Sequence, residues 1–199
     1  MPRLLVFAGP NGSGKSTVTE RIKTVGKYVN ADEIKKQLDC SDIEAAKIAE
    51  ATREYLVKNK EDFTFETVLS TSRNIDLMER AKAAGYYVVC VYILTKDPEI
   101  NISRVKNRVE HGGHGVPDER VRERFIRALR LFPKLFAICD ELYVFDNSKD
   151  APDGYENLIA EWKGSRISVF PNEVWDTAMI TSLIGGDYPD DYQIGRAHV

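Results

Sequence analysis

The chain has 199 residues, of which 43% are hydrophobic and 30% are charged, and its formal net charge is −3. A chain of this length can bury one hydrophobic core but is short for two ordinary domains with separate cores. The slightly acidic balance argues against a protein that works mainly by nonspecific attraction to nucleic acid or to an anionic membrane surface.

The apolar runs and the cysteines indicate the cellular compartment of the protein. The longest apolar run, residues 88–94, is far shorter than the ~20 residues that a membrane span needs. Residues 1–3 lead directly into an apolar stretch rather than into a secretory leader. The cysteines are isolated, odd in number and without metal-ligand spacing, which is typical of free thiols in a reducing compartment. We therefore expect a cytoplasmic protein without a membrane partner.

The first elements expected are a buried strand at residues 4–8 and a helix that opens near Gly14. Between them, residues 9–17 read Gly-Pro-Asn-Gly-Ser-Gly-Lys-Ser-Thr. This stretch fits the phosphate-binding pattern G-x-x-x-x-G-K-[ST] in its required setting between a strand and a helix. Residue types, spacing and flanking elements agree, so we interpret the stretch as a P-loop rather than as a glycine-rich turn with a chance lysine.

Each position of the P-loop has an expected task toward a nucleoside triphosphate. The glycines let backbone N–H groups turn inward around the phosphates, Lys15 reaches the β- and γ-phosphates, and the Ser16 hydroxyl is placed on Mg²⁺. The expected cofactors are therefore ATP and Mg²⁺. The expected nucleotide-binding residues are Gly9, Asn11, Gly12, Ser13, Gly14, Lys15, Ser16 and Thr17.

Strands and helices alternate along the rest of the chain. The further strands expected are residues 28–30, 63–69, 86–94 and 142–145, and the further helices are residues 41–58, 75–84, 98–109 and 117–139. The helix at 41–58 opens with a capping-box pattern, Ser-Asp-Ile-Glu. Strands alternating with helices of this length predict an α/β fold in three layers, with a mainly parallel sheet covered on both faces.

Residues 111–115 read His-Gly-Gly-His-Gly and interrupt the helical pattern before Pro117. We interpret His111 and His114, with the nearby Asp118, as loop residues rather than as a metal site.

The pattern weakens after Asn147, where a turn at residues 152–154 and an edge strand at 167–170 are expected. Residues 194–199 resemble translated sequencing-adapter read-through and are given no role. We therefore divide the chain into a P-loop domain at 1–170, a C-terminal appendage at 171–193 and an artefactual tail at 194–199.

The P-loop alone does not separate motors, transport ATPases, GTPases and kinases. The apolar strand ending at Leu94 is followed by Thr95 and Lys96, not by the Asp typical of motors and transporters. Residues 59–62, Asn-Lys-Glu-Asp, fit the guanine-reading pattern N-K-x-D, but they precede a strand instead of following one, and D-x-x-G is absent from the sequence. These features favour a kinase.

Two carboxylates are candidates for chemistry. Asp32 follows the second strand and Glu66 lies in the third, so a parallel sheet brings both toward its carboxyl edge beside the P-loop. An Asp within hydrogen-bond reach of an alcohol can accept its proton as the oxygen attacks the γ-phosphate. The alternatives are a helix N-cap or first-turn acid for Asp32, which is compatible with catalysis, and a strand residue on a solvated face for Glu66.

Arginines flank the glycine-rich break on both sides. Arg104 and Arg108 are four residues apart on one helix, and Arg120, Arg124 and Arg127 form a stripe on the next. Such a stripe is commonly a solvated face. Its place beside a glycine-rich hinge favours instead a helical lid that supplies cations to the γ-phosphate.

In this order, the P-loop, Asn-Ala-Asp-Glu at 30–33, Phe-Glu-Thr at 65–67 and Gly-Gly-His at 112–114 resemble the zeta-toxin family of P-loop kinases, particularly its small stand-alone branch. The resemblance covers residues 1–148. It implies a fold like that of nucleotide and shikimate kinases, and characterised members phosphorylate UDP-N-acetylglucosamine at its 3′-hydroxyl. The implied partners are a small-molecule hydroxyl acceptor and an antitoxin protein.

The resemblance also implies residue roles. Lys15 and Ser16 hold ATP and Mg²⁺, Asp32 is the catalytic base, Glu66 and Thr67 bind the sugar nucleotide, and Arg104 or Arg108 is the first lid arginine. The chain departs from the family where the toxins carry a second lid arginine before a Thr-Pro helix start. His114 stands before Val116-Pro117 here, which leaves Arg120 or Arg124 to reach the phosphate. After Glu66-Thr67 the chain continues Val-Leu-Ser, unlike the family's Glu-Thr-Thr-Gly pattern.

The sequence thus predicts a kinase that transfers the γ-phosphoryl group of ATP to a hydroxyl of a small molecule, such as a nucleotide sugar. Its expected catalytic residues are Asp32, Lys15, Arg108 and Arg124. Two alternatives stay open: an ATP-dependent switch that presents its lid to a protein partner, and a nucleic-acid end kinase. An end kinase needs a basic groove, and the acidic balance makes nucleic acid an unfavoured partner.

Overall fold

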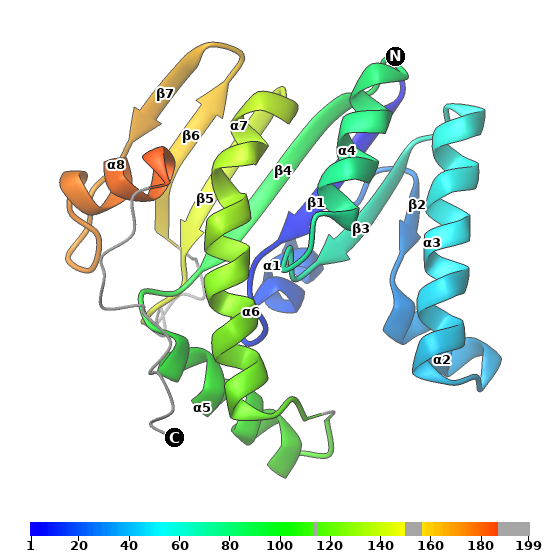
Figure 1. Ribbon diagram of the computed structural model, residues 1–199, viewed down its shortest axis with the longest axis horizontal. Coiled ribbons are helices and arrows are strands. Elements are labelled where there is room, and N and C mark those ends of the chain that lie inside the picture. Colours follow the sequence, from blue (N-terminus) through cyan, green and yellow to red (C-terminus); the bar gives the residue numbers. More distant parts are fainter. Residues whose placement is uncertain (114, 150–156, 187–199) are drawn as a thin grey trace, which may run out of the picture.

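The computed structural model describes residues 1–113, 115–149 and 157–186. This part of the chain forms a seven-stranded sheet with helices on both faces (Figure 1). The strand order is β2-β3-β1-β4-β5-β6-β7, and the pairs are parallel as far as β5 and antiparallel from β5 to β7. The expected α/β fold with a mainly parallel sheet is confirmed. The expectations for His114, for a turn at 152–154 and for the tail at 194–199 lie outside the described residues.

The elements are bounded as follows. The strands are β1 (Arg3–Ala8), β2 (Lys27–Val29), β3 (Phe63–Thr67), β4 (Tyr87–Leu94), β5 (Glu141–Asp146), β6 (Asn157–Lys163) and β7 (Arg166–Val169). The helices are α1 (Lys15–Arg21), α2 (Ala31–Leu38), α3 (Asp42–Asn59), α4 (Arg73–Ala83), α5 (Pro98–Glu110), α6 (Asp118–Leu131), the 3-10 turn η1 (Phe132–Lys134), α7 (Leu135–Ile138) and α8 (Thr177–Gly185). None of the described helices has the length and apolar character to cross a membrane.

Strand β1 organises the core because its side chains alternate between the two faces of the sheet. Leu4 and Val6 join the main hydrophobic core, to which α3, α4, α6, α7 and α8 all contribute. Leu5 and Phe7 face the opposite way and pack with Val18 of α1 in a smaller cluster. Figure 1 shows the same division, with α3, α4, α6 and α7 in front of the sheet and α1 behind it.

The parallel register brings the ends of three central strands to one edge of the sheet. Ala8 at the end of β1 pairs with Thr67 at the end of β3 and with Tyr92 in β4. The backbone N–H of Gly9 then donates to the Thr67 carbonyl at 3.2 Å. The P-loop therefore starts at the carboxyl edge, where parallel α/β sheets bind ligands.

Helices α5 and α6 pack on each other through a small apolar cluster that is separate from the main core. Ile102 and Val105 of α5 meet Val121 of α6 in this cluster, with Val116 packed against it. Surface ion pairs also join the two helices; Lys106 Nζ of α5, for example, lies 2.7 Å from Asp118 Oδ2 of α6. This helix pair occupies the position expected for the lid.

The structure differs from the expected elements at several places, and it adds β6 and α8, which were not expected. The single helix expected at 117–139 ends at Leu131, because Pro133 has no N–H to donate and its ring disfavours a continuing α-helix, so η1 intervenes before α7. Helix α2 entered the expectations only through the alternative that Asp32 caps or begins a helix. None of its residues is fully buried, but its apolar residues Ala31, Ile34 and Leu38 follow helical spacing, and Ala31 and Ile34 pack against the main core. Beyond residue 170, Trp175, Ile180 and Leu183 are buried in the main core.

Candidate active site

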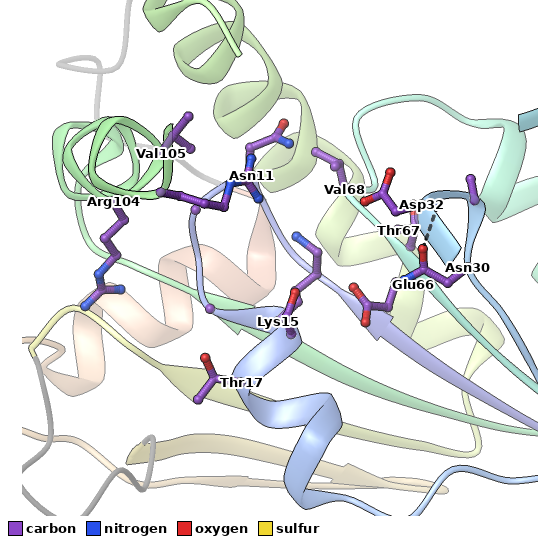
Figure 2. A pocket seen from close by; sticks show the side chains of 15 residues that line it. Asn11, Lys15, Thr17, Asn30, Asp32, Glu66, Thr67, Val68, Arg104 and Val105 are labelled. Atoms are coloured by element: carbon purple, nitrogen blue, oxygen red, sulfur yellow. Dashed lines mark hydrogen bonds between the residues drawn. The ribbon is translucent and has the colours of Figure 1, made fainter. Parts of the chain in front are cut away.

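A cavity of about 440 Å³ opens at the carboxyl edge of the sheet, beside the P-loop. It brings together residues from the P-loop, β3, the start of α2 and the lid helix α5. Figure 2 shows Lys15 between Arg104 on one side and the carboxylates of Asp32 and Glu66 on the other. The lining residues are Asn11, Gly12, Gly14, Lys15, Ser16, Thr17, Asn30, Ala31, Asp32, Glu66, Thr67, Val68, Arg104, Val105 and Arg108.

The turn of the P-loop depends on glycine at position 12. Gly12 has φ +76°, and a Cβ built there would lie 2.4 Å from the backbone oxygen of Asn101 in α5. Any L side chain at this position would meet both backbone strain and a collision. The loop consequently approaches the lid helix closely, and its own backbone faces the cavity.

Lys15 projects back over the P-loop. Its Nζ donates to the carbonyl oxygens of Gly9 at 2.7 Å and of Pro10 at 2.9 Å. Burial lowers the pKa of the Lys15 ammonium to about 8; the nearby Glu66 carboxylate opposes this shift and the Arg108 guanidinium adds to it. The ammonium therefore lies among the charges of the cavity, with only loop carbonyls as direct partners among the described residues.

Asp32 lies in the first turn of α2 and lines the cavity with an exposed side chain. The N-cap is Asn30, whose Oδ1 accepts from the backbone N–H of Asp32 at 2.8 Å (Figure 2) and from that of Glu33 at 3.4 Å. The alternative that Asp32 itself caps the helix is wrong, whereas the first-turn position is confirmed. Because Asn30 performs the capping, the Asp32 carboxylate is available to the cavity.

Glu66 and Thr67 come to the cavity from the end of β3. The alternative of a solvated strand face for Glu66 is wrong, because its side chain is half-buried and its Oε1 accepts from Tyr28 OH and, at 3.0 Å, from Thr19 Oγ1. Thr67 is buried, and its Oγ1 accepts from the backbone N–H of Leu69 at 2.9 Å and from Asn74 Nδ2 at 2.8 Å. These two bonds leave the Thr67 hydroxyl proton for donation.

The lid arginines differ in position: Arg104 and Arg108 line the cavity, whereas Arg124 contacts the P-loop without lining the cavity. Arg108 lines the cavity directly. Arg104 also lines it and donates from Nη1 to the Asn147 carbonyl at 2.7 Å. Arg124 crosses from α6 to the P-loop, where Nη1 is 3.2 Å from Asn11 Oδ1. Arg120 is exposed and does not line the cavity.

The P-loop is also held by residues that the sequence analysis missed. Asn101 is fully buried; its Nδ2 donates to the Asn11 carbonyl at 2.6 Å, and its Oδ1 accepts from Thr95 Oγ1. Asn147 Nδ2 donates to the Ser13 carbonyl at 2.8 Å. Two sequence features could have identified these residues. Asn101 is a polar residue beside apolar positions of a helix, and Asn147 directly follows a buried strand.

Not every expected nucleotide-binding residue lines the cavity. Gly9 and Ser13 belong to the loop but are not among the lining residues, and the buried Ser13 Oγ has no hydrogen-bond partner in the described part of the chain. The exposed hydroxyl-bearing Ser16 and Thr17 do line it. Glycine backbone, hydroxyls and three cationic side chains on one cavity fit a polyphosphate with a divalent cation.

Comparisons with known proteins identify relatives of this chain. Residues 1–153 match the family model described as zeta toxin. An uncharacterized protein of Haemophilus influenzae is 33% identical over an alignment of 129 residues, and the match covers 62% of this chain and 92% of that protein.

Solved structures share the fold at low sequence identity. The AvrRxo1-ORF1:AvrRxo1-ORF2 complex with sulphate ions matches with a TM-score of 0.69 and 18% identity over 96% of this chain and 66% of the matched chain. The same complex with ATP matches with a TM-score of 0.68 and 19% identity, over 96% and 65%. The PezAT chromosomal toxin–antitoxin system of Streptococcus pneumoniae matches with a TM-score of 0.56 and 14% identity, over 96% and 82%.

This chain spans just under two thirds of the matched AvrRxo1 chain. The structural likenesses show a shared fold, and the family match extends over residues 1–153 of 199. The chain belongs to the zeta toxin family.

Proposed function

We propose that this protein is an ATP-dependent kinase that transfers the γ-phosphoryl group to a hydroxyl of a small molecule. The observation that carries the proposal is one cavity that joins the P-loop lysine, Lys15, to the exposed carboxylate of Asp32. A phosphotransferase needs both, because the phosphates require a cationic cradle and the attacking alcohol requires a proton acceptor. A nucleotide pocket without the carboxylate would support binding alone.

ATP is the proposed phosphoryl donor. The AvrRxo1-ORF1:-ORF2 complex, which shares the fold of this chain, was solved with ATP, and this supports the choice. In this chain, Lys15 and Arg108 would face the phosphates, and Ser16 with Thr17 would hold Mg²⁺. Bound Mg²⁺ would neutralise part of the negative charge of the triphosphate.

The proposed reaction assigns one step to each side of the cavity. The acceptor hydroxyl loses its proton to Asp32 as its oxygen forms a bond to the γ-phosphorus, and the bond between that phosphorus and the β–γ bridging oxygen breaks, releasing ADP. Glu66 and Thr67 orient the acceptor. Arg108 and Arg124 stabilise the charge that spreads over the γ-phosphate oxygens.

A nucleotide sugar, with UDP-N-acetylglucosamine as the first candidate, is the proposed acceptor, on the basis of the family resemblance. The PezAT structure comes from a toxin–antitoxin system, and an antitoxin protein is correspondingly a proposed partner. We place the reaction in the cytoplasm, in line with the free thiols expected there.

The test uses ATP labelled at the γ-phosphate, Mg²⁺ and a panel of acceptors: UDP-N-acetylglucosamine, other nucleotide sugars, small alcohols and 5′-hydroxyl oligonucleotides. We expect label on a nucleotide sugar or another small alcohol. Label released only as inorganic phosphate would replace the proposal with an ATP-driven switch. Label on the oligonucleotide would replace it with a nucleic-acid end kinase.

A further inference from the structure

The hydroxyl of Tyr28, in β2, connects the two carboxylate positions of the cavity. It donates to Glu66 Oε1, and it accepts from Asn30 Nδ2 at 3.0 Å. Asn30 Oδ1 in turn accepts from the backbone N–H of Asp32 at 2.8 Å. Hydrogen bonds therefore run without a break from the first turn of α2, which carries Asp32, to the carboxylate of β3.

The direction of this chain of hydrogen bonds is fixed by chemistry. Asn30 uses its amide oxygen to cap α2, so its amide nitrogen is the atom that faces Tyr28. A phenol has one proton, and because Tyr28 accepts from Asn30 it gives that proton to Glu66. Burial and the bond to Glu66 raise the pKa of the Tyr28 hydroxyl, which keeps it protonated as a donor.

Thr19 is the second donor near Glu66, but its proton is shared. Thr19 Oγ1 lies 3.0 Å from Glu66 Oε1 and 2.9 Å from the Lys15 carbonyl, and one hydroxyl proton serves one acceptor at a time. Both donors meet Oε1 of the carboxylate. Among the described residues, Oε2 accepts no hydrogen bond, so it is the oxygen that can face a ligand.

We propose that Tyr28 is a positioning residue of the phosphoryl-transfer site. Its hydroxyl holds one oxygen of Glu66, turns the other toward the acceptor, and ties this carboxylate to the helical turn that bears Asp32. Tyr28 does not line the cavity and acts through Glu66. The inference rests on the proposed function, because it concerns where the acceptor sits relative to the base.

The experiment replaces Tyr28→Phe, which removes the hydroxyl and keeps the ring. Tyr143→Phe is the matched control, because Tyr143 also donates to a glutamate, Glu141 Oε2 at 2.5 Å, but in β5 away from the cavity. The acceptor probe is UDP-N-acetylglucosamine, or the panel member that the wild type phosphorylates. We expect kcat/KM for the acceptor to fall about tenfold or more, while the Kd for ATP and the thermal midpoint match those of the control.

A double-mutant cycle with Glu66→Gln tests the route of the effect. If Tyr28 acts through Glu66, the loss caused by Tyr28→Phe largely disappears when Glu66 is already Gln. An equal loss in both backgrounds, an unchanged kcat/KM, or a loss matched by weaker ATP binding would each overturn the positioning role. If the wild type transfers phosphate and the Tyr28→Phe variant has the same kcat/KM for the acceptor, this inference alone is overturned. Wild-type protein that labels no acceptor overturns the proposed function and this inference with it.

Discussion

Arg124 in the lid helix α6 donates from Nη1 to Oδ1 of Asn11 in the P-loop, at 3.2 Å. The guanidinium is half-buried, and burial together with the neighbouring Arg120 and Arg127 lowers its pKa. Its partner at this contact is a neutral amide oxygen, which compensates a buried cation less well than an anion does. A phosphate at the P-loop is a stronger acceptor, so we expect Arg124 to move from Asn11 to the γ-phosphate.

Arg124→Ala should therefore lower kcat by about a hundredfold or more, because charge on the γ-phosphate loses a donor in the transition state. The Kd for ATP should change by less than about fivefold, since Lys15 remains in place. Steady-state kinetics and ATP titration measure the two effects. Arg127→Ala is the control, because Arg127 pairs with Glu123 on the exposed side of the same helix. Equal losses in both variants would contradict the assignment.

Asn101→Ala should destabilise the P-loop, because it removes a hydrogen bond that holds the loop in place. The substitution removes the 2.6 Å bond to the Asn11 carbonyl and leaves Thr95 Oγ1 without its side-chain acceptor in the core. Unfolding in urea should show a loss of about 1–3 kcal/mol, together with weaker ATP binding. Asn107→Ala, at an exposed position on the same helix, should change neither. Wild-type ATP affinity in the Asn101 variant would show that the loop does not depend on this side chain.

ATP binding should weaken as the pH rises through the Lys15 pKa of about 8. The ammonium form binds phosphate, and bound phosphate raises its pKa, so binding takes up a proton wherever the free protein holds Lys15 neutral. The affinity should be nearly constant between about pH 7 and 8 and fall by up to about tenfold per unit above that.

Calorimetric titration across this range, in buffers of different ionisation enthalpy, measures both the affinity and the proton uptake. Lys15→Ala supplies the control, since it should bind ATP weakly and lack the alkaline fall. A wild-type Kd that stays flat above the Lys15 pKa would remove Lys15 as the phosphate-binding cation.

The sequence predicted the part of the site that depends on chain order and strand ends. The P-loop at residues 9–17 has a recognisable pattern, and Asp32 and Glu66 could be placed beside it because parallel strands end at one edge of the sheet. The capping box at Ser41 is confirmed for the same reason, since its spacing is local.

What the sequence could not decide depends on tertiary packing. That Arg124 and not Arg120 contacts the P-loop follows from how Val121 and Ile102 set α6 against α5, and spacing along one helix carries no such information. Tyr28 reads as an ordinary aromatic strand residue, and only its neighbours reveal the hydrogen bond to Glu66. Pro133, by contrast, was a visible signal, and the continuous helix expected there was wrong.

The most direct measurement is phosphoryl transfer by Asp32→Asn, compared with Glu33→Gln. Both substitutions remove one negative charge from the first turn of α2, but only Asp32 lines the cavity. With the acceptor that the wild type phosphorylates, Asp32→Asn should lower kcat by about 10²–10⁴-fold and keep the wild-type Kd for ATP, while Glu33→Gln stays close to wild type. Turnover by Asp32→Asn at the rate of the Glu33→Gln control would contradict the account of Asp32 as the proton acceptor.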